Sequence, residues 1–353
     1  MKICFFNCAK VWGGGEKWHM EHALALLQEG HQVVVVSNKN SELLKRASAR
    51  QIKTKSFSLG NLSFLNPAKL FSVYRFFKKE KFDVIIMNFS KDLKVAAPMA
   101  RLAKIPKIVY RRGSAIPIKN SLSNRFLFRR LTHIIANSEA TKTTILQNNP
   151  NLFPEERIKV IYNGINIPDP ETKKQNDIPV VGTLGRLVYQ KGLDILLDIA
   201  AILKNRQVVC KIRIGGDGVL KDELNKQARE NDLSDYVEFT GFVDHPNEFM
   251  NHIDIFVLTS RWEGFGYVLT EAMCAKNPIV AFDISSNPEL VFNEENGFLI
   301  PFEDKEAFAN SIQLLVTQPS IREKMGNTGY EIVKRKFDFE QNKKKLLDFL
   351  ATD

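Results

Sequence analysis

Residues 253–275 read IDIFVLTSRWEGFGYVLTEAMCA. The run Ile253–Leu258 is predicted to be a strand, and Gly264–Gly266 to be a turn. The small and apolar residues at positions 269, 272, 273 and 275 recur at helical spacing. Strand, glycine loop and helix in this order form the repeating unit of a parallel α/β sheet. Two carboxylates bracket the loop: Glu263 at its mouth, and Glu271 about one turn inside the helix.

This arrangement of charge favours a particular kind of ligand. A helix N-terminus presents free N–H groups and partial positive charge, which suit an anion. Glu263 and Glu271 would repel a phosphate unless they faced something else, and sugar hydroxyls are good hydrogen-bond donors to carboxylates. A phosphate beside a polyhydroxyl group describes a nucleotide sugar. The alternative is a pair of acid and base carboxylates, as in a glycoside hydrolase.

The bulk composition sets the broad class. A chain of 353 residues is expected to form two domains. With 44% apolar and 25% charged residues, it is typical of a soluble globular protein. The N-terminal KICFF predicts a strand rather than a signal peptide, and no apolar run reaches membrane-spanning length. A cytoplasmic location follows, with free thiols expected at Cys4, Cys8, Cys210 and Cys274 because they show no paired spacing.

The net charge of +10 is unevenly distributed. Residues 1–170 contain 28 Lys and Arg against 11 Asp and Glu, which gives +17, and the remainder has 22 against 29, which gives −7. A basic first half predicts an anionic partner there. The basic, aromatic stretches Phe71–Lys81 and Ser121–Leu131 favour an anionic membrane surface, so peripheral attachment at the inner face of the cytoplasmic membrane is an option. No nucleic-acid partner is expected, because no recognised nucleic-acid-binding motif occurs.

Strands and helices alternate along both halves of the chain. We predict an N-terminal domain at 1–167, a C-terminal domain at 168–336, and a final helix at 337–353, capped near Asp338, that crosses back to the first domain. The polar, proline-flanked stretch Pro168–Pro179 is predicted to be the linker. The fold class is therefore α/β, with two parallel-sheet domains facing across a cleft. Every glycine-rich loop follows a predicted strand, where parallel sheets bind ligands.

Further residues suggest binding chemistry. Arg186 and Lys191 follow the first strand of the second domain, and two cations could neutralise a leaving diphosphate without a metal. The Gly13–Gly15 loop could approach a phosphate, although Trp18 breaks the dinucleotide pattern GxGxxG. Arg111 and Arg112 end a strand and could bind an anionic acceptor or donor phosphate. No His/Cys cluster and no Asp-x-Asp is present, so no metal is expected.

Taken together, these motifs resemble the retaining glycosyltransferase family 4, which has the GT-B fold of two Rossmann-like domains. The resemblance covers nearly the whole chain and is strongest from about Arg157 to Leu315. The motifs are VIYNGI (160–165), GTLGRLVYQKGLDILLDIA (182–200), IGGDG (214–218), VEFTGFV (237–243), SRWEGFGYVLTEAMCAKNPIVAFD (260–283) and GFLIPFEDKEAFANSI (297–312).

The resemblance implies a function and site roles. It implies a retaining transferase that moves a sugar from a UDP- or GDP-sugar to a cell-envelope glycan or lipid-linked acceptor, as in bacterial lipopolysaccharide or polysaccharide synthesis. The nucleotide sugar is a substrate, and no cofactor is expected. Arg186 and Lys191 would hold the diphosphate and Glu263 the transferred sugar, as the catalytic set. The donor-binding set would be Gly14, Gly15, Gly185, Gly216, Val243, Gly264, Phe265, Gly266 and Glu271, and the acceptor set Arg111, Arg112 and His19.

One departure from the family pattern affects the mechanism. Many members have a histidine after the strand that reads KIVYRRGSA here, and this chain has arginines instead. No side-chain general base is therefore assigned, and the leaving phosphate oxygen could accept the acceptor proton in a front-face mechanism. Two other readings stay open: a non-catalytic GT-B module that binds nucleotide sugars and recruits partners to a membrane, and a GT-B epimerase or phosphorylase.

Overall fold

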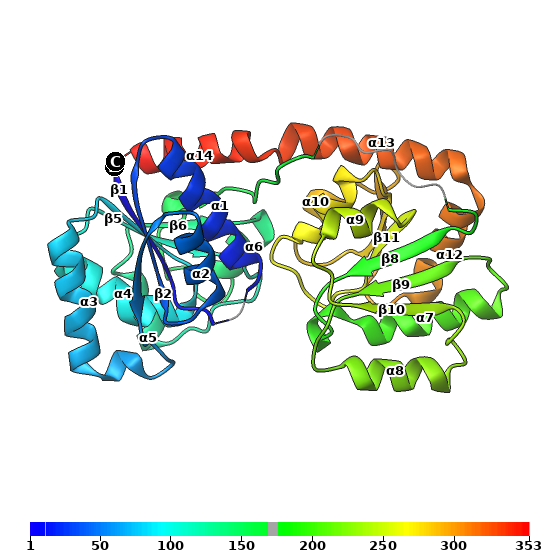
Figure 1. The fold of residues 1–353 in the computed structure, drawn as a ribbon, viewed down its shortest axis with the longest axis horizontal. Coiled ribbons are helices and arrows are strands. Elements are labelled where there is room, and N and C mark those ends of the chain that lie inside the picture. The colour runs from blue at the N-terminus through cyan, green and yellow to red at the C-terminus, as the bar shows by residue number, and fades with distance from the viewer. Residues whose placement is uncertain (11, 169–175, 353) are drawn as a thin grey trace. The chain divides into compact units, whose positions relative to one another are not determined.

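The computed structural model describes residues 1–10, 12–168 and 176–352. Most of the predicted linker therefore lies outside the described residues. The chain divides into two compact units, each built on its own sheet (Figure 1). Unit 1 comprises Met1–Asn163 and Asn342–Asp353, and unit 2 comprises Gly164–Gln341.

The sheet of unit 1 has seven parallel strands in the order β3-β2-β1-β4-β5-β6-β7. The order reverses direction between β1 and β4, which creates the switch point at which open parallel sheets bind ligands. The strands are β1 (Lys2–Asn7), β2 (Gln32–Asn38), β3 (Lys53–Phe57), β4 (Val84–Met87), β5 (Lys107–Arg112), β6 (His133–Ala136) and β7 (Ile158–Val160).

Both faces of this sheet are buried, which explains the continuous apolar runs in its central strands. Successive side chains alternate between the faces. Cys4, Phe6 and Tyr110 pack on one face, where the helices are α3, α4, α5 and α6. Phe5 and Val109 pack on the other, against α1, α2 and α14. The helices of unit 1 are α1 (Gly14–Gln28), α2 (Glu42–Ala49), α3 (Pro67–Glu80), α4 (Ser90–Leu102), α5 (Leu122–Phe128), α6 (Glu139–Leu146) and α14 (Phe339–Ala351).

Unit 2 repeats the plan with six parallel strands in the order β10-β9-β8-β11-β12-β13, and its switch point lies between β8 and β11. Figure 1 shows α9 and α10 on one side of this sheet and α7 and α8 on the other. The strands are β8 (Val180–Leu184), β9 (Lys211–Gly215), β10 (Val237–Gly241), β11 (Ile255–Leu258), β12 (Ile279–Phe282) and β13 (Gly297–Ile300). The helices are α7 (Leu193–Asn205), α8 (Lys221–Glu230), α9 (Pro246–Asn251), α10 (Tyr267–Cys274), α11 (Asn287–Leu290), α12 (Lys305–Thr317) and α13 (Pro319–Lys336).

The helix α14 belongs to unit 1 although unit 2 precedes it in the sequence. Asp338 caps it, as predicted, because its Oδ1 accepts from the N–H of Gln341 at 2.9 Å. Leu346 and Leu350 are buried in the core beside α1. Lys107 of β5 donates its Nζ to the backbone oxygen of Phe349 at 2.7 Å, which places a cation at the helix C-terminus.

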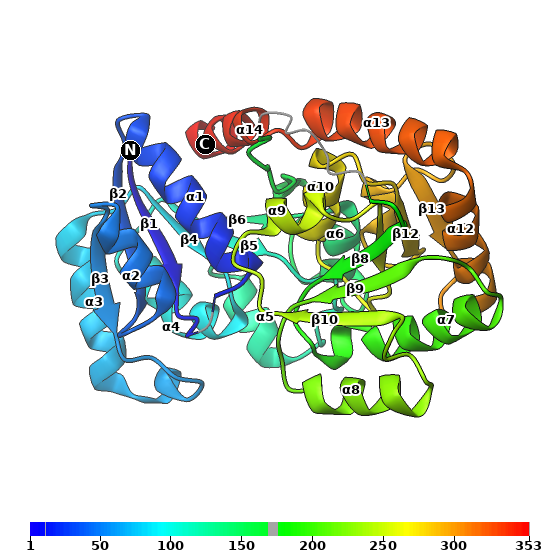
Figure 2. The same ribbon diagram turned by 45° about the vertical axis from the view of Figure 1, so that its right-hand side comes forward.

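The structure confirms two parallel-sheet, Rossmann-like units, which Figure 2 shows as twisted sheets with helices on both sides. The four cysteines are buried free thiols, as predicted. Among the described residues, no helix combines the length and the apolar character that crossing a bilayer requires.

Candidate functional site

The switch point of unit 2 brings together the loop after β8 and the loop after β11. In the first loop, Lys191 ends a single 3-10 turn, Tyr189–Lys191, and Gly192 follows with φ of 59°. A Cβ on Gly192 would lie 2.1 Å from the backbone oxygen of Thr259 in the second loop. Only glycine allows this approach, so the backbones of the two loops pack directly against each other.

Lys191 and Glu263 meet across this junction. The Nζ of Lys191 lies 2.6 Å from Oε1 of Glu263, and the Ser260 hydroxyl donates to the same oxygen at 2.6 Å. Both charged side chains are largely buried, with 15% and 7% of their areas exposed. Two groups 72 residues apart in sequence therefore form one ion pair, a contact that the motifs did not predict.

Arg186 lies in the same loop, and its side chain is exposed. Its only recorded partner among the described residues is Gln190, whose Oε1 accepts from Nη2 at 3.4 Å. Such a weak contact leaves the guanidinium available to an anion above the strand ends.

A second set of contacts fastens the two loops. Arg261 donates to both carboxylate oxygens of Asp194, on the first turn of α7, at 2.9 and 2.6 Å. Its guanidinium also stacks 4.0 Å from the ring centre of Tyr189. Hydrogen bonding to Arg261 lowers the pKa of Asp194. The side chain of Gln190 donates to the backbone oxygen of Trp262 at 3.0 Å, which adds another hydrogen bond between the loop after β8 and the loop after β11.

The glycines of the neighbouring loops are required by backbone proximity. Gly216 has φ of 136°, and a Cβ there would lie 1.8 Å from the oxygen of Gly185. The N–H of Gly185 donates to the Gly215 oxygen at 2.9 Å, so the ends of β8 and β9 touch. Val243, which follows β10, is half-buried beside Gly215.

The motif EGFGYVLTE spans the loop after β11 and the helix α10. Gly266 is the N-cap of α10 with φ of 81°, and Gly264 precedes it in a half-buried position. Phe265 turns its ring into the core against Phe337, at 5.6 Å between ring centres, so only its backbone is at the loop. Glu271 is half-buried in the second turn of α10.

The switch point of unit 1 holds the glycine turn. Gly13 is the N-cap of α1, and no side chain caps the helix, so Gly14 and Gly15 form its first turn. The carboxylate of Glu16 accepts from Nδ2 of Asn7 at 3.0 Å, and burial raises the pKa of Glu16. A Cβ on Gly15 would lie 2.3 Å from Nδ2 of Asn88, the residue that follows β4.

The structure does not bring Arg111 and Arg112 together. They are consecutive residues of β5, so their side chains point to opposite faces of the sheet. Arg111 lies over the Trp18 ring at 4.9 Å, and Arg112 donates to the hydroxyl of Tyr110 at 3.3 Å. Both are more than 90% buried. Binding of one anion by the adjacent pair, the reading suggested by their sequence neighbourhood, does not fit this geometry.

His19 is also placed away from solvent. Its side chain is fully buried, with its ring edge-on to Phe5 at 5.4 Å and close to Trp18. Burial lowers the pKa of His19 well below its usual value, and the nearby Arg111 lowers it further. His19 therefore presents no exposed atom to an acceptor in this structure.

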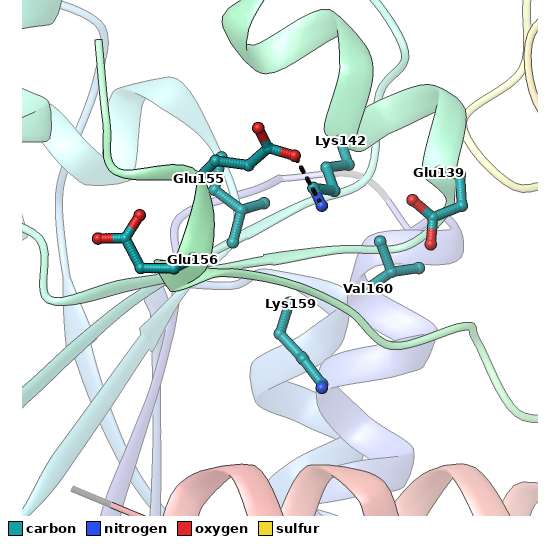
Figure 3. A pocket seen from close by; sticks show the side chains of 7 residues that line it. Glu139, Lys142, Glu155, Glu156, Lys159 and Val160 are labelled. Carbon is teal, nitrogen blue, oxygen red and sulfur yellow. Dashed lines mark ion pairs between the residues drawn. The ribbon is translucent and has the colours of Figure 1, made fainter. Parts of the chain in front are cut away.

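A separate hollow of about 480 Å³ lies along the edge strand β7. Figure 3 shows Lys142 of α6 reaching toward Glu155, with 3.0 Å between Nζ and Oε1. None of the residues predicted to bind donor or acceptor lines it, and β7 is three strands away from the switch point. We assign it no role in the candidate site.

Sequence reasoning missed several residues of both switch points. Ser260, Arg261 and Asp194 surround the Lys191–Glu263 pair, and Asn88 and Asn163 contact Arg111. Their signal was position alone. Ser260, Arg261 and Asn88 follow strands at the switch points and Asp194 begins a helix there, whereas Asn163 follows the edge strand β7. Among the described residues, no group of three His, Cys, Asp or Glu side chains has the geometry to hold a metal ion.

Comparison with known proteins places this architecture in a family. Residues 167–332 match the model for "Glycosyl transferases group 1", and residues 12–168 match "Glycosyltransferase Family 4". An Escherichia coli UDP-Gal:alpha-D-GlcNAc-diphosphoundecaprenol alpha-1,3-galactosyltransferase is 30% identical over 78% of this chain and 79% of its own length. The chain belongs to the group 1 glycosyltransferases.

The share of each relative that this chain covers varies widely. The poly(ribitol-phosphate) alpha-N-acetylglucosaminyltransferase of Staphylococcus aureus is 29% identical, and the alignment spans 62% of this chain but 44% of that protein. Among solved structures, Anabaena HepE in complex with UDP-glucose superposes with a TM-score of 0.84 at 25% identity, covering 99% of each chain. Staphylococcus aureus TarM, at 16% identity and a TM-score of 0.84, shares the fold over 100% of this chain and 99% of its own.

Proposed function

We propose that this protein is a retaining glycosyltransferase that moves a sugar from a UDP- or GDP-sugar to a cell-envelope glycan or a lipid-linked acceptor. The nucleotide sugar is a substrate, and neither a cofactor nor a metal is invoked. The observation that supports this proposal most is the contact of Lys191 with Glu263 at the switch point of unit 2.

The chemistry of unit 2 suits a nucleotide diphosphate sugar. Lys191 and the exposed Arg186 supply positive charge where a leaving diphosphate gains negative charge. Glu263 and the Gly264–Gly266 backbone position the transferred sugar, and Glu271 binds the ribose hydroxyls. The ion pair holds Lys191 in place before the ligand arrives, so less ordering is needed in the transition state.

The donor is proposed to be a uridine nucleotide in the first instance. HepE, which shares the fold over the whole chain, is described in complex with UDP-glucose. GDP-sugars remain in the proposal because the family resemblance implies either a UDP- or a GDP-sugar donor.

The acceptor is proposed from the relatives and from the charge of unit 1. The Escherichia coli relative and a Campylobacter jejuni relative are both named for diphospho-undecaprenol acceptors. Residues 1–170, with 17 more cationic than anionic side chains, are suited to a phosphorylated lipid acceptor.

The proton of the acceptor hydroxyl is proposed to pass to the leaving phosphate oxygen. Arg111 and Arg112 end the strand after which many family members have a histidine, and neither arginine can accept a proton. The protein then acts by orienting the reactants and stabilising the leaving group, and the sugar keeps its anomeric configuration.

Attachment to an anionic membrane surface is the remaining part of the proposal. The helices α3 and α5 expose Phe71, Leu122 and Phe126 among basic residues. They lie on the same face of the sheet as α4, which packs against both of them. Aromatic and basic side chains on one face are typical of helices that rest on anionic lipid.

The transfer proposal is tested with purified protein, UDP- and GDP-sugars, and extracts that contain lipid-linked acceptors. Nucleotide release that depends on acceptor is the expected result, with the product linkage analysed by NMR for retention. Glu263→Ala is expected to abolish transfer while nucleotide binding persists. The proposal fails if neither class of nucleotide sugar binds or turns over.

The same assay separates the alternatives. A binding module would hold nucleotide tightly without transfer. An epimerase would act on the nucleotide sugar with no acceptor present, and a phosphorylase would consume sugar-1-phosphate and release orthophosphate.

Membrane attachment is tested by co-sedimentation with vesicles of phosphatidylglycerol and phosphatidylcholine. The double variant Lys78→Glu/Lys79→Glu on α3 is expected to lose binding at low salt. The matched variant Lys221→Glu/Arg229→Glu, also exposed but on α8 of unit 2, should bind like the wild type. Wild-type protein that stays in the supernatant at low salt would remove this part of the proposal.

A further inference from the structure

Four elements of unit 1 converge beneath the glycine turn. Gly15 lies in the first turn of α1, Asn88 follows β4, Arg111 is the last residue but one of β5, and Asn163 lies three residues after β7. Asn163 is also the last residue of unit 1 before the chain enters unit 2. A single side chain, that of Arg111, contacts two of these elements at once.

The guanidinium of Arg111 acts as a two-pronged donor. Its Nη1 donates to Oδ1 of Asn88 at 2.9 Å, and its Nη2 donates to Oδ1 of Asn163 at 2.8 Å. Only 3% of the residue is exposed, and its plane lies over the Trp18 ring. A Cβ on Gly113 would lie 2.8 Å from Nη1, so the chain after β5 also leaves room for this group.

These hydrogen bonds fix the orientation of Asn88. Because Oδ1 accepts from Arg111, the amide nitrogen of Asn88 points the other way, toward Gly15. The space for a Cβ at Gly15 is taken by that nitrogen at 2.3 Å. Asn88 thus forms the floor of the glycine turn, and Arg111 determines where that floor lies.

We propose that Arg111 is a positioning residue that sets the glycine turn through Asn88 and ties it to the end of unit 1 through Asn163. The role needs the planar fork of arginine, since an ammonium group on a flexible chain cannot hold two amide oxygens in fixed directions. The inference extends the proposed function, because the glycine turn is where we expect unit 1 to approach the donor phosphates.

Arg112 provides a matched control. It is the next residue of β5, it is 8% exposed, and its guanidinium also donates twice, to the Tyr110 hydroxyl and to the backbone oxygen of Ile116. It points to the opposite face of the sheet, away from the glycine turn. Arg111→Lys and Arg112→Lys therefore each replace a buried guanidinium of β5 that makes two hydrogen bonds. Only Arg111→Lys should affect the glycine turn.

The first experiment requires no substrate. Gly15→Ala is introduced into the wild type, into Arg111→Lys and into Arg112→Lys, and the melting temperature is measured. Gly15 lies in a helix, where alanine is otherwise a favourable residue, so the expected cost of Gly15→Ala comes from the clash of its Cβ with Asn88. We expect Gly15→Ala to lower Tm by several degrees in the wild type and in Arg112→Lys, and by less than half as much in Arg111→Lys, where Asn88 can move aside.

An equal Tm loss in all three backgrounds would overturn the proposal, because Asn88 would then be held by something other than Arg111. If Arg111→Lys does not fold, Arg111→Gln replaces it, with the same expected relief. As a check on the floor itself, Gly15→Ala should cost nothing in an Asn88→Ala background.

The second experiment measures transfer. Arg111→Lys is expected to lower kcat/KM for the nucleotide sugar at least tenfold when rates are compared per folded molecule. Combining Arg111→Lys with Asn88→Ala should give no further loss, because both act on one floor. A kcat/KM for Arg111→Lys within twofold of the wild type, per folded molecule, would assign Arg111 to general stability alone. An inactive wild type that still shows the Tm pattern would refute the proposed function and keep this inference.

Discussion

The ion pair of Lys191 and Glu263 leads to a prediction that can be worked out from its geometry. Lys191→Met and Glu263→Gln each keep the approximate shape of the side chain and remove its charge. Either change leaves the other charge largely buried without its 2.6 Å partner. Breaking a buried pair typically costs 3–5 kcal/mol, and the hydroxyl of Ser260 still binds Glu263, so we expect about 3 kcal/mol for Lys191→Met. Glu263→Gln should cost about 2 kcal/mol, because Lys191 is more exposed and flexible.

The double variant is expected to be less damaged than the two single changes would suggest. With no unpaired charge left, it should lose about 2 kcal/mol rather than about 5, a coupling of about 3 kcal/mol. For a unit of this size, 1 kcal/mol corresponds to roughly 2–4 °C in Tm, so Lys191→Met should melt about 6–12 °C lower than the wild type.

The assay is calorimetric unfolding of the wild type, the two single variants and the double variant. Lys305→Met serves as control, since its pair with Asp198 on α7 also spans 2.6 Å but is more than one-third exposed. It should shift Tm by less than about 4 °C. Additive losses in the double variant would refute the reasoning, because they would mean that Lys191 and Glu263 do not stabilise each other.

Three further predictions concern two glycines, the pH dependence of stability, and the ion pair between Asp194 and Arg261. Gly216→Ala should destabilise the protein by at least about 3 kcal/mol in chemical denaturation. Gly30 also has a positive φ, but a Cβ there would meet no atom within 4 Å, so Gly30→Ala should cost only the backbone strain of about 1–2 kcal/mol. Burial lowers the pKa of His22 to about 3, so below pH 6.5 the unfolded chain takes up a proton at His22 that the folded chain does not. The free energy of unfolding should therefore fall by about 2 kcal/mol between pH 6.5 and 5 because of His22. His22→Gln should remove this part of the decrease seen in the wild type. Asp194→Asn should lower transfer about tenfold, while Asp198→Asn, one turn further along α7, should leave it within twofold; equal effects would mean that the pair with Arg261 does not position the site.

Much of the fold was predictable because it depends on local rules. Glycine, β-branched residues and helical spacing marked most strands and helices, including KIVYRR, which is β5 residue for residue. The strand β3 was missed because KTKSF is polar and lies at the edge of the sheet, where its side chains are mostly exposed. Its place depends on pairing with β2, which no local pattern shows.

The candidate site was predictable where a motif fixed both the residue and its loop. Lys191 and Glu263 were both selected from their motifs, and each follows a strand at the switch point of unit 2, but the ion pair between them was not predicted. His19 and the Arg111–Arg112 pair were placed by sequence neighbourhood alone. Alternation along β5 separates the two arginines, and the helical face of α1 turns His19 into the core. The two-residue period of a strand could have separated the arginines in advance.

The contribution of α14 to unit 1 has a consequence for synthesis of the chain on the ribosome. The core of unit 1 includes Leu346 and Leu350, and Lys107 of β5 binds the end of the same helix. When residues 1–163 emerge, this part of their core is still missing, while unit 2 can already assemble. We therefore expect the first sheet to complete its packing after the second, so that unit 1 remains open to proteases and chaperones until the final helix has been released.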